Sequence, residues 1–172
     1  MNYDVFGPFK LPRSTNGLFT RDARTKREFW EEIQSSHDGL ADACGCYLLS
    51  VRNRIWYVGL AEKQSFRVEC MAPHKVNKID DAIATAQGEA YLTLIARKTP
   101  TDRFMRPSVN GIADAAQLEL LLIGAALERN DKLLNKQATK IVRDVVVPGF
   151  LNSPHGCGNR SSVKEFRKIM GL

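Results

Sequence analysis

Polar and apolar positions follow two different periods along this chain, and each period predicts a different kind of element. Two β-prone runs, residues 45–49 and 55–58, lie on either side of the polar pair Arg52-Asn53 and predict a β-hairpin. A third run of the same character at residues 90–96 predicts another strand. The sequence therefore favours a central three-stranded antiparallel sheet.

Apolar residues at helical spacing predict helices on either side of these strands. The expected helices span residues 26–36, 60–71, 78–87 and 112–127, with a closing helix that opens near Ser162 and ends at Gly171. Capping-box spacing marks the first and the last of them, at residues 25–28 and 162–165, and Pro73 is expected to stop the second. The 112–127 segment is the most continuously apolar stretch of the chain, which indicates a buried helix.

Two further segments carry weaker signals. Residues 1–24 contain turn-forming residues without sustained periodicity and predict an irregular arm. Residues 141–147 fit either a strand or the end of a helix. Together the elements define an α+β chain, and its 172 residues fit one compact domain with extensions.

The charge balance of the chain is basic. Lysine and arginine total 25 against 19 for aspartate and glutamate, which gives a net charge of +6 and a pI near 9.3. Folding could gather these cations on one face for a polyanionic partner, or leave them as a solvated surface. No apolar run reaches the roughly 18 residues of a membrane span, and the N-terminus lacks the pattern of a signal peptide. We therefore expect a cytoplasmic protein with no membrane partner.

The four cysteines are too few for a disulfide scaffold in a chain of this length, so reduced thiols are the simpler interpretation. Cys44 and Cys46 together with His155 and Cys157 could be drawn as a zinc site. Structural zinc sites usually begin with two cysteines separated by two to four residues, and this spacing is a poor match.

Glu119 stands out because its predicted helix face is otherwise apolar. The neighbours three and four positions away are Ala115, Ala116, Leu122 and Ile123. A buried carboxylate needs a partner, since an unpaired buried charge is costly. The partner is either Arg67, in a structural ion pair, or a metal ion, because Mg²⁺ is commonly held by one or two carboxylates with water and phosphate.

Tyr47 and Tyr57 lie on the two arms of the predicted hairpin, where a three-residue connection would place them directly opposite each other on one face. Strand tyrosines commonly serve packing alone. Arg67 lies on the next predicted helix, four residues after Lys63 and on the same side of it. The Arg67 side chain could point toward the hairpin face, or Arg67 could be an ordinary surface residue.

At these positions the sequence resembles the GIY-YIG nuclease family. The matching elements, in order, are Gly45-Cys46-Tyr47, Tyr57-Val58-Gly59, Arg67, Glu119 and Leu134-Asn135-Lys136. Cys46 replaces the usual aliphatic residue of the first motif, a tolerable exchange because cysteine packs as a small hydrophobe. Five elements in the right order and spacing are far more specific than any one of them.

The resemblance covers about residues 43–137. It implies a small GIY-YIG-type catalytic core with a three-stranded antiparallel sheet flanked by helices. Residues 1–42 would then form an N-terminal arm and helix, and residues 138–172 a C-terminal extension packed on the core.

The resemblance also implies an activity, namely metal-dependent hydrolysis of a phosphodiester bond in nucleic acid, with DNA as the expected substrate. By analogy Glu119 would bind Mg²⁺ or Mn²⁺, and Arg67 would stabilise the charge of the transition state. Tyr47 would act as general base, which requires cations such as Arg67, Lys63 or the metal to lower its pKa from about 10.

The same analogy gives the remaining residues supporting roles. Tyr57 would orient water or phosphate, and Asn135 would brace the site or simply cap a helix end. Lys63, Lys75 and Lys136 would contact nucleic acid. His74 is more simply a surface histidine than a proton shuttle. One such centre cuts one strand, so a double-strand break would require a homodimer or two visits.

Two other interpretations stay open at this point. One is a catalytically silent module that keeps the fold and binds nucleic acid without cutting it, although such a module has no use for Tyr47, Tyr57, Arg67 and Glu119 together. The other is an unrelated basic α+β interaction protein in which every match is core packing.

Overall fold

The computed structural model describes residues 2–135, 139, 144–148 and 154–171. The chain divides into two compact units, Met1–Leu134 and Asn135–Leu172, and each is described by itself. In the second unit the described residues include a 3₁₀ turn at Cys157–Asn159 and helix α6 at Ser161–Met170. The segment 141–147, which fitted a strand or a helix end, lies partly outside the described residues.

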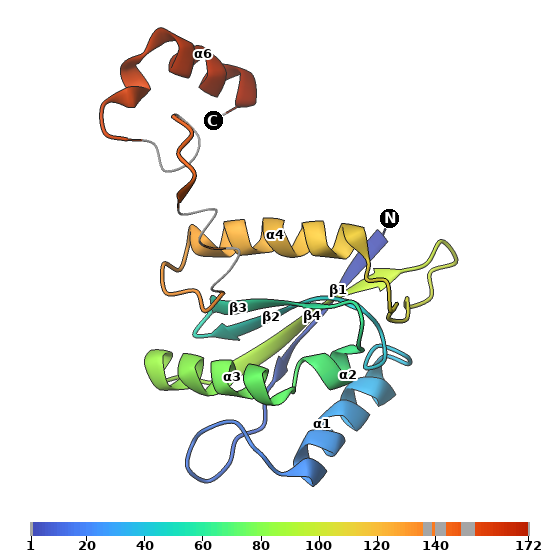
Figure 1. The fold of residues 1–172 in the computed structure, drawn as a ribbon. Helices are drawn as coiled ribbons and strands as arrows, with labels where there is room; N and C mark the ends of the chain where they lie inside the picture. The colour runs from blue at the N-terminus through green and yellow to red at the C-terminus, as the bar shows by residue number, and fades with distance from the viewer. Residues whose placement is uncertain (1, 136–138, 140–143, 149–153, 172) are drawn as a thin grey trace. The chain divides into compact units, whose positions relative to one another are not determined.

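The sheet of the first unit has four antiparallel strands, one more than the sequence predicted (Figure 1). They are β1 (Asn2–Lys10), β2 (Gly45–Val51), β3 (Arg54–Ala61) and β4 (Ala90–Lys98), in the spatial order β1-β4-β2-β3. The additional strand β1 takes the place of the first part of the irregular arm expected at residues 1–24. It was missed because it is an edge strand with mostly exposed residues, and its register shifts between Phe6 and Phe9, around Pro8.

Strands β2 and β3 form the predicted hairpin, but its turn is shorter than expected. Arg52 and Asn53 alone make the connection, with φ values of 50° and 59° that are typical of a type I′ turn. The register then shifts between Leu49 and Ser50, which leaves Trp56 as the extra residue of a β-bulge.

Four helices complete the first unit within its described residues. They are α1 (Ala23–Ser36), α2 (Phe66–Glu69), α3 (Pro73–Ala86) and α4 (Ala113–Leu127). Helix α1 begins earlier than expected because Asp22, and not a capping box at 25–28, accepts a 2.7 Å hydrogen bond from the backbone N–H of Thr25. Helix α6, by contrast, begins without a side-chain capping bond, and it ends as predicted at Gly171, with φ of 72°.

The prediction of one helix over residues 60–71 is wrong. Strand β3 continues to Ala61, and only the single turn of α2 follows it. Pro73 does not stop a helix; it begins α3, because the first helical position needs no N–H donor. Helix α3 therefore includes most of the helix expected at 78–87 and brings His74 and Lys75 onto its first turn.

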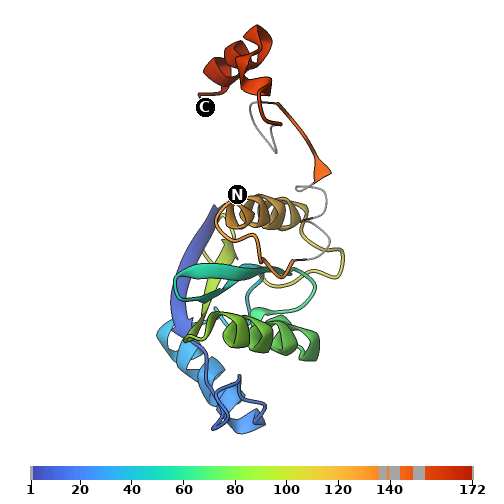
Figure 2. The same cartoon turned by 90° about the vertical axis from the view of Figure 1, so that its left-hand side faces the viewer.

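Helices cover both faces of the sheet, with α1, α2 and α3 on one face and α4 on the other (Figures 1 and 2). The larger hydrophobic cluster includes Ile33 of α1, Phe66 of α2 and Ile79 of α3. A smaller cluster contains Ile112 and Ala115 at the start of α4. The core that supports the hairpin therefore lies mainly on the α3 face.

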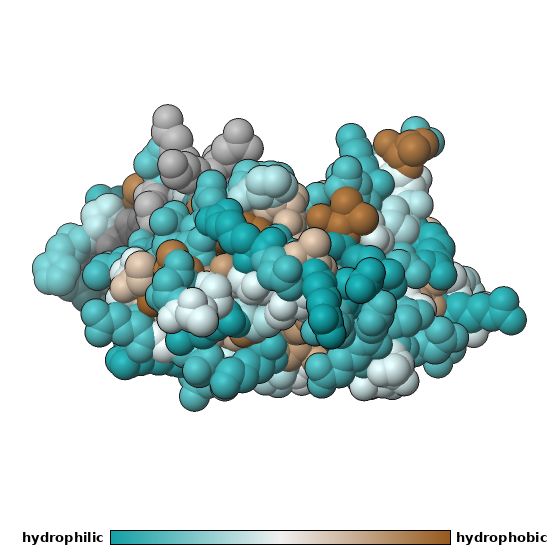
Figure 3. Space-filling model, turned by 90° about the horizontal axis from the view of Figure 1, so that it is seen from below, coloured by the Kyte–Doolittle hydropathy of each residue, from teal (hydrophilic) through white to brown (hydrophobic). Residues whose placement is uncertain are grey.

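Helix α4 is not the fully buried helix that its composition predicts. Ala115, Ile123 and Ala126 are buried, whereas Leu120 and Leu121 are 54% and 72% exposed. Viewed from the opposite side, beneath α1 and α3, the surface is mainly hydrophilic and its apolar residues form small separate patches (Figure 3). None of the helices in the described ranges has both the length and the apolar character needed to cross a membrane.

Candidate active site

The two motif glycines occupy positions where the backbone leaves no room for a side chain. A Cβ on Gly45, which has φ of 147°, would overlap the backbone oxygen of Ile95 in β4. A Cβ on Gly59 would overlap the ring of Tyr47. Gly45 therefore lets β2 approach β4 closely, and Gly59 lets the Tyr47 ring lie across β3.

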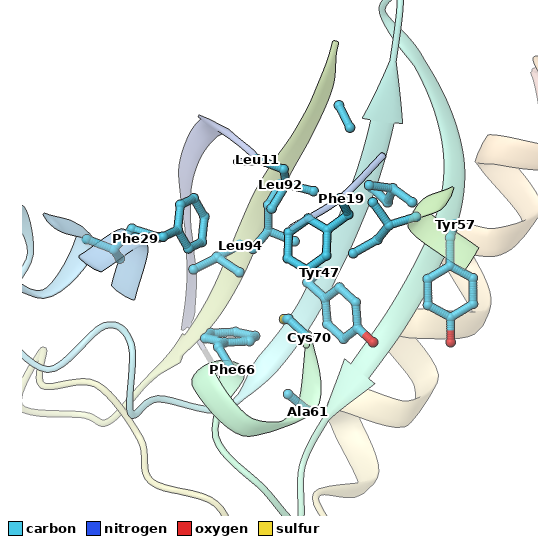
Figure 4. Packing of buried hydrophobic residues seen from close by; sticks show 14 of the residues in the cluster. Leu11, Phe19, Phe29, Tyr47, Tyr57, Ala61, Phe66, Cys70, Leu92 and Leu94 are labelled. Carbon is cyan, nitrogen blue, oxygen red and sulfur yellow. The ribbon is translucent and has the colours of Figure 1, made fainter. Parts of the chain in front are cut away.

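Tyr47 and Tyr57 share one face of the hairpin, as the sequence predicted, but they are diagonal neighbours and not directly opposite. With the two-residue turn and the bulge, Tyr47 pairs with Gly59 and Tyr57 pairs with Leu49. The two ring centroids are 6.1 Å apart, and both hydroxyl groups point to the same side of the hydrophobic cluster (Figure 4). The hydroxyl groups of the two tyrosines thus lie together at the edge of an apolar core.

Lys75 links this pair of tyrosines to a carboxylate. Its Nζ donates a 2.7 Å hydrogen bond to Tyr57 Oη and lies 3.2 Å from Glu69 Oε1. The same Nζ is 5.9 Å from the ring centroid of Tyr47 and 5.0 Å from that of Tyr57. Burial lowers the pKa of Lys75, but the contacts with Tyr57 and Glu69 outweigh burial and the net shift is upward. Lys75 is therefore a fixed cation at the centre of the cluster.

Lys78 adds a second cation to Tyr57, one turn further along α3. Its Nζ lies 4.8 Å from the Tyr57 ring centroid and donates a 2.9 Å hydrogen bond to the carbonyl of Leu134. The N–H of Leu134 in turn donates to the carbonyl of Trp56 at 2.8 Å. Two lysines spaced by three residues on one helix thus face the same phenol.

The hydroxyl of Tyr47 is buried and has no hydrogen-bond partner among the described residues. Burial raises the pKa of this phenol well above its ordinary value, and the ionisable groups beside it raise it further. Neither Arg67 nor Lys63 is among the main groups that act on it. The expectation that these two cations lower the pKa of Tyr47 is therefore wrong for the protein alone.

Glu119 is half-buried on α4, the helix on the opposite face of the sheet from Lys75 (Figure 1). Burial raises its pKa, the charge of Lys75 lowers it, and the carboxylates of Glu62 and Glu69 raise it again, so the net shift is upward. The charge of Lys75 thus acts on Glu119 from the other face of the sheet.

Glu119 is the carboxylate of this group that could hold a divalent cation. Glu69 is paired with Lys75, and Glu62 accepts a 2.8 Å hydrogen bond from the N–H of Ile112, so neither is as available as Glu119. Among the described residues, no group of three or more histidine, cysteine, aspartate and glutamate side chains is arranged to hold a metal. A metal at Glu119 would thus have one protein ligand, with water and phosphate completing its shell, as Mg²⁺ commonly accepts.

Arg67 does not reach the tyrosines, which corrects an expectation from the sequence. Its Nη2 lies 3.4 Å from Asp42 Oδ1, and its side chain is 42% exposed. It lines a pocket of about 310 Å³ together with Trp30 and Met71. Because α2 is a single turn, the direction expected from a longer helix does not apply. Arg67 consequently neither faces the hairpin nor forms the structural ion pair with Glu119 that was the alternative to a metal.

The other expected site residues are not gathered around the tyrosines. Lys63 is exposed in the bend after β3, and His74 is exposed on the first turn of α3. Asn135 opens the second unit, where it is buried and its carbonyl accepts a hydrogen bond from the hydroxyl of Thr139. Lys136 lies outside the described residues.

Sequence reasoning assigned Lys75 to nucleic-acid contact alone and did not consider Lys78 for the site. A signal for both was present in Pro73, which favours the first position of a helix as well as the end of one. A helix that starts at Pro73 places Lys75 and Lys78 three residues apart on one side.

Cys44 and Cys46 are buried thiols that each donate to a backbone carbonyl. Cys44 Sγ lies 3.5 Å from the oxygen of Arg106, and Cys46 Sγ lies 3.3 Å from that of Ala115. Burial raises the pKa of Cys44 to about 11 and that of Cys46 to about 12, so both are protonated at neutral pH. Both thiols thus have backbone acceptors, and no group of three or more potential metal ligands is found among the described residues. The side chain of Cys157 lies outside the described part of the chain.

Comparisons of the chain with protein-family models, with curated proteins and with solved structures found no match. The described residues establish an α+β fold with a four-stranded antiparallel sheet flanked by helices.

Proposed function

We propose that this protein is a metal-dependent endonuclease that hydrolyses phosphodiester bonds of nucleic acid, with DNA as the expected substrate. The observation that most supports this function is the 2.7 Å hydrogen bond from Lys75 to Tyr57, beside the unpartnered hydroxyl of Tyr47. With Glu119, on which the charge of Lys75 acts, the site would offer a cation, phenols and a metal-binding carboxylate, which together complement the charge of a phosphoryl transition state.

Lys75 takes the role that the family resemblance gave to Arg67. Its raised pKa keeps the ammonium protonated at neutral pH. Since Tyr57 Oη accepts a hydrogen bond from Lys75, its own O–H can donate to a phosphate oxygen. The two side chains would bind and orient the phosphate and offset the negative charge that develops on it.

Glu119 would hold the Mg²⁺ or Mn²⁺ ion. When bound, the metal supplies Lewis-acid stabilisation of the phosphate and of the leaving oxygen. Glu62 and Glu69 strengthen the negative potential at Glu119, and their effect on its pKa is upward. A positive ion placed beside Glu119 would reverse that shift and relieve the cost of the buried charge.

Tyr47 is the proposed general base, acting on the attacking water. Its hydroxyl oxygen has no donor in the described part of the protein and is therefore available to a proton. The residue is 2% exposed and its pKa is raised, so its action requires bound substrate and metal to admit water and to stabilise the phenolate.

A catalytically silent nucleic-acid-binding module with the same fold is the second candidate. Two observations favour it, namely the pairing of Arg67 with Asp42 and the raised pKa of Tyr47. Such a module would use Lys75 and Lys78 to bind phosphate and would not cut it.

The two candidates differ in a direct cleavage assay. The purified chain is incubated with supercoiled plasmid, single-stranded DNA and RNA, each with Mg²⁺, with Mn²⁺ and with a chelator. We expect nicking or linearisation only in the presence of a divalent metal. Cleavage undiminished by the chelator would contradict the metal role, and binding without cutting under every condition would favour the silent module.

A further inference from the structure

A polar pocket lies at the tip of the β2–β3 hairpin, apart from the tyrosines. Its volume is about 450 Å³, and its walls come from the hairpin turn, the last turn of α3 and the segment after α4. Three of its lining residues are cations, Arg52, Arg54 and Lys132, and one, Asp131, is a carboxylate. The pocket thus carries an excess of positive charge.

The three cations of this pocket are exposed, and none of them forms an ion pair with a described residue. Most other arginines of the first unit do form one: Arg21 lies 2.8 Å from Asp80, and Arg24 lies 2.7 Å from Glu28. Cations that converge on a pocket without carboxylate partners are available to an anion from solution.

The indole N–H of Trp56, which also lines the pocket, is a donor without an acceptor. Its Nε1 is buried and has no hydrogen-bond partner among the described residues, and the residue is 6% exposed. The other tryptophan, Trp30, donates to Met71 Sδ at 3.1 Å. A buried N–H without an acceptor carries a desolvation cost, which an anionic acceptor would offset.

The backbone holds these groups in place. The turn at Arg52 and Asn53 has positive φ at both residues, and the stem of Arg52 packs against Gly88, where a Cβ would lie 2.7 Å from Arg52 Cγ. The β-bulge brings Trp56 into the same hydrophobic cluster as Tyr57. The pocket and the candidate active site therefore belong to the same face of the hairpin.

The distance between them suits a nucleic-acid strand. Arg54 precedes Tyr57 by three residues along β3, which corresponds to about 10 Å of extended strand. Stacked nucleotides rise by about 3.4 Å each, so this distance corresponds to about three of them.

We propose that the hairpin-tip pocket binds a backbone phosphate of the strand that enters the Tyr57–Lys75 site. Arg52, Arg54 and Lys132 provide the positive charge, and Trp56 donates its indole N–H. The existence of a phosphate site at the pocket is independent of catalysis, whereas its assignment to the substrate strand rests on the proposed function.

The test uses the two tryptophan indole resonances of the full-length ¹⁵N-labelled protein, assigned with a Trp30→Phe variant. Inorganic phosphate and an oligothymidylate of eight nucleotides are titrated separately, with a chelator present so that the oligonucleotide is not cleaved. We expect the oligonucleotide to shift the Trp56 resonance and to leave that of Trp30 in place. Arg54→Gln should also lower the slope of log K against log salt by about 0.7, the value of one contact on single strands.

The matched control separates the pocket from net charge. The triple variant Arg52→Gln, Arg54→Gln, Lys132→Gln should weaken oligonucleotide binding more than tenfold. Arg21→Gln, Arg24→Gln, Arg27→Gln removes the same charge from residues before and within α1 and should weaken it far less. Equal losses in the two triple variants would overturn the proposal.

The remaining outcomes are equally decisive. A Trp56 resonance that responds to neither probe removes the pocket as a phosphate site. A response to inorganic phosphate alone overturns the assignment to a strand. If the protein fails to cut with any metal while the oligonucleotide still shifts Trp56, the proposed nuclease function fails and the phosphate site stands.

Discussion

The buried charges on the two faces of the sheet differ in the contacts that surround them. On the α3 face, Lys75 has Tyr57 Oη at 2.7 Å and Glu69 Oε1 at 3.2 Å, and these contacts raise its pKa. On the α4 face, burial raises the pKa of Glu119, and its nearest charged neighbours do not compensate. The fold thus holds the cation in place through its contacts, whereas Glu119 forms no ion pair with a described residue.

Helix α4 itself contains the same contrast. Asp114, five residues before Glu119, accepts 2.7 Å and 2.9 Å hydrogen bonds from Arg97 and Tyr3. Burial raises the pKa of Asp114, but these two bonds outweigh burial and the net shift is downward. Among the described residues, α4 thus pairs Asp114 and leaves Glu119 without an ion pair, which is the pattern expected if Glu119 serves the proposed function.

The largest expected effect is on cleavage rate when Lys75 loses its charge. Lys75→Gln should lower the rate by about 10²–10³-fold, as the loss of a positioned transition-state donor does. Arg67→Gln removes the same charge from α2 and should leave the rate close to that of the wild type. Both are measured under single-turnover conditions, with melting temperatures recorded alongside. The opposite ranking would return Arg67 to the active site.

Glycine substitutions test the packing beneath the tyrosines. Gly59→Ala should lower the free energy of unfolding by about 1–3 kcal/mol, because its Cβ would overlap the Tyr47 ring. Gly124→Ala on α4 meets nothing within 4 Å and should raise it by up to about 1 kcal/mol through helix propensity. Urea unfolding measures both, and equal effects would mean that the Tyr47 ring is not held over β3.

The two tyrosine hydroxyls should differ in what their removal does to stability. Tyr47→Phe deletes a buried hydroxyl that has no hydrogen-bond partner among the described residues, and it should raise the free energy of unfolding by about 1 kcal/mol. Tyr57→Phe leaves Lys75 without one acceptor and should lower it by about 1–3 kcal/mol. If Tyr47→Phe is as destabilising as Tyr57→Phe, the Tyr47 hydroxyl has a partner in solution.

The smallest expected effect is the pH dependence of stability at Glu119. The folded-state pKa of Glu119 is raised, so its contribution to stability is present below the ordinary pKa of 4.5 and is lost as the pH rises through the folded value. Glu119→Gln should therefore stabilise the metal-free protein at pH 7, by less than about 1 kcal/mol, and the gain should vanish below pH 4. A gain that persists in acid would assign the effect to packing.

Much of this fold could be predicted because its pattern is local. The hairpin, β4, α1 and the end of α6 followed from periodicity, turn residues and a C-terminal glycine. Strand β1 could not be predicted, because an exposed edge strand shows no alternation of polar and apolar residues and is specified by its partner β4. Pro73 was ambiguous, because proline both ends one helix and starts the next.

The candidate site could be predicted where local strand pairing fixes the positions of its side chains, and not where tertiary packing does. Tyr47 and Tyr57 share a face because both lie on paired strands, and Gly45 and Gly59, which flank them, leave no room for a side chain of their own. The direction of the Arg67 side chain depends on whether its helix has one turn or three. Its ion-pair partner, Asp42, lies on a loop far from it in the sequence. Lys75 reaches Tyr57 only through tertiary packing of α3 on β3.

The most direct test of the account is cleavage by Glu119→Gln, measured in Mg²⁺ at pH 7 on a labelled strand, with melting in the same buffer without metal. The account predicts that the variant melts no lower than the wild type and binds DNA, but does not cut it. Wild-type cleavage by this variant would contradict the metal site and with it the proposed nuclease mechanism.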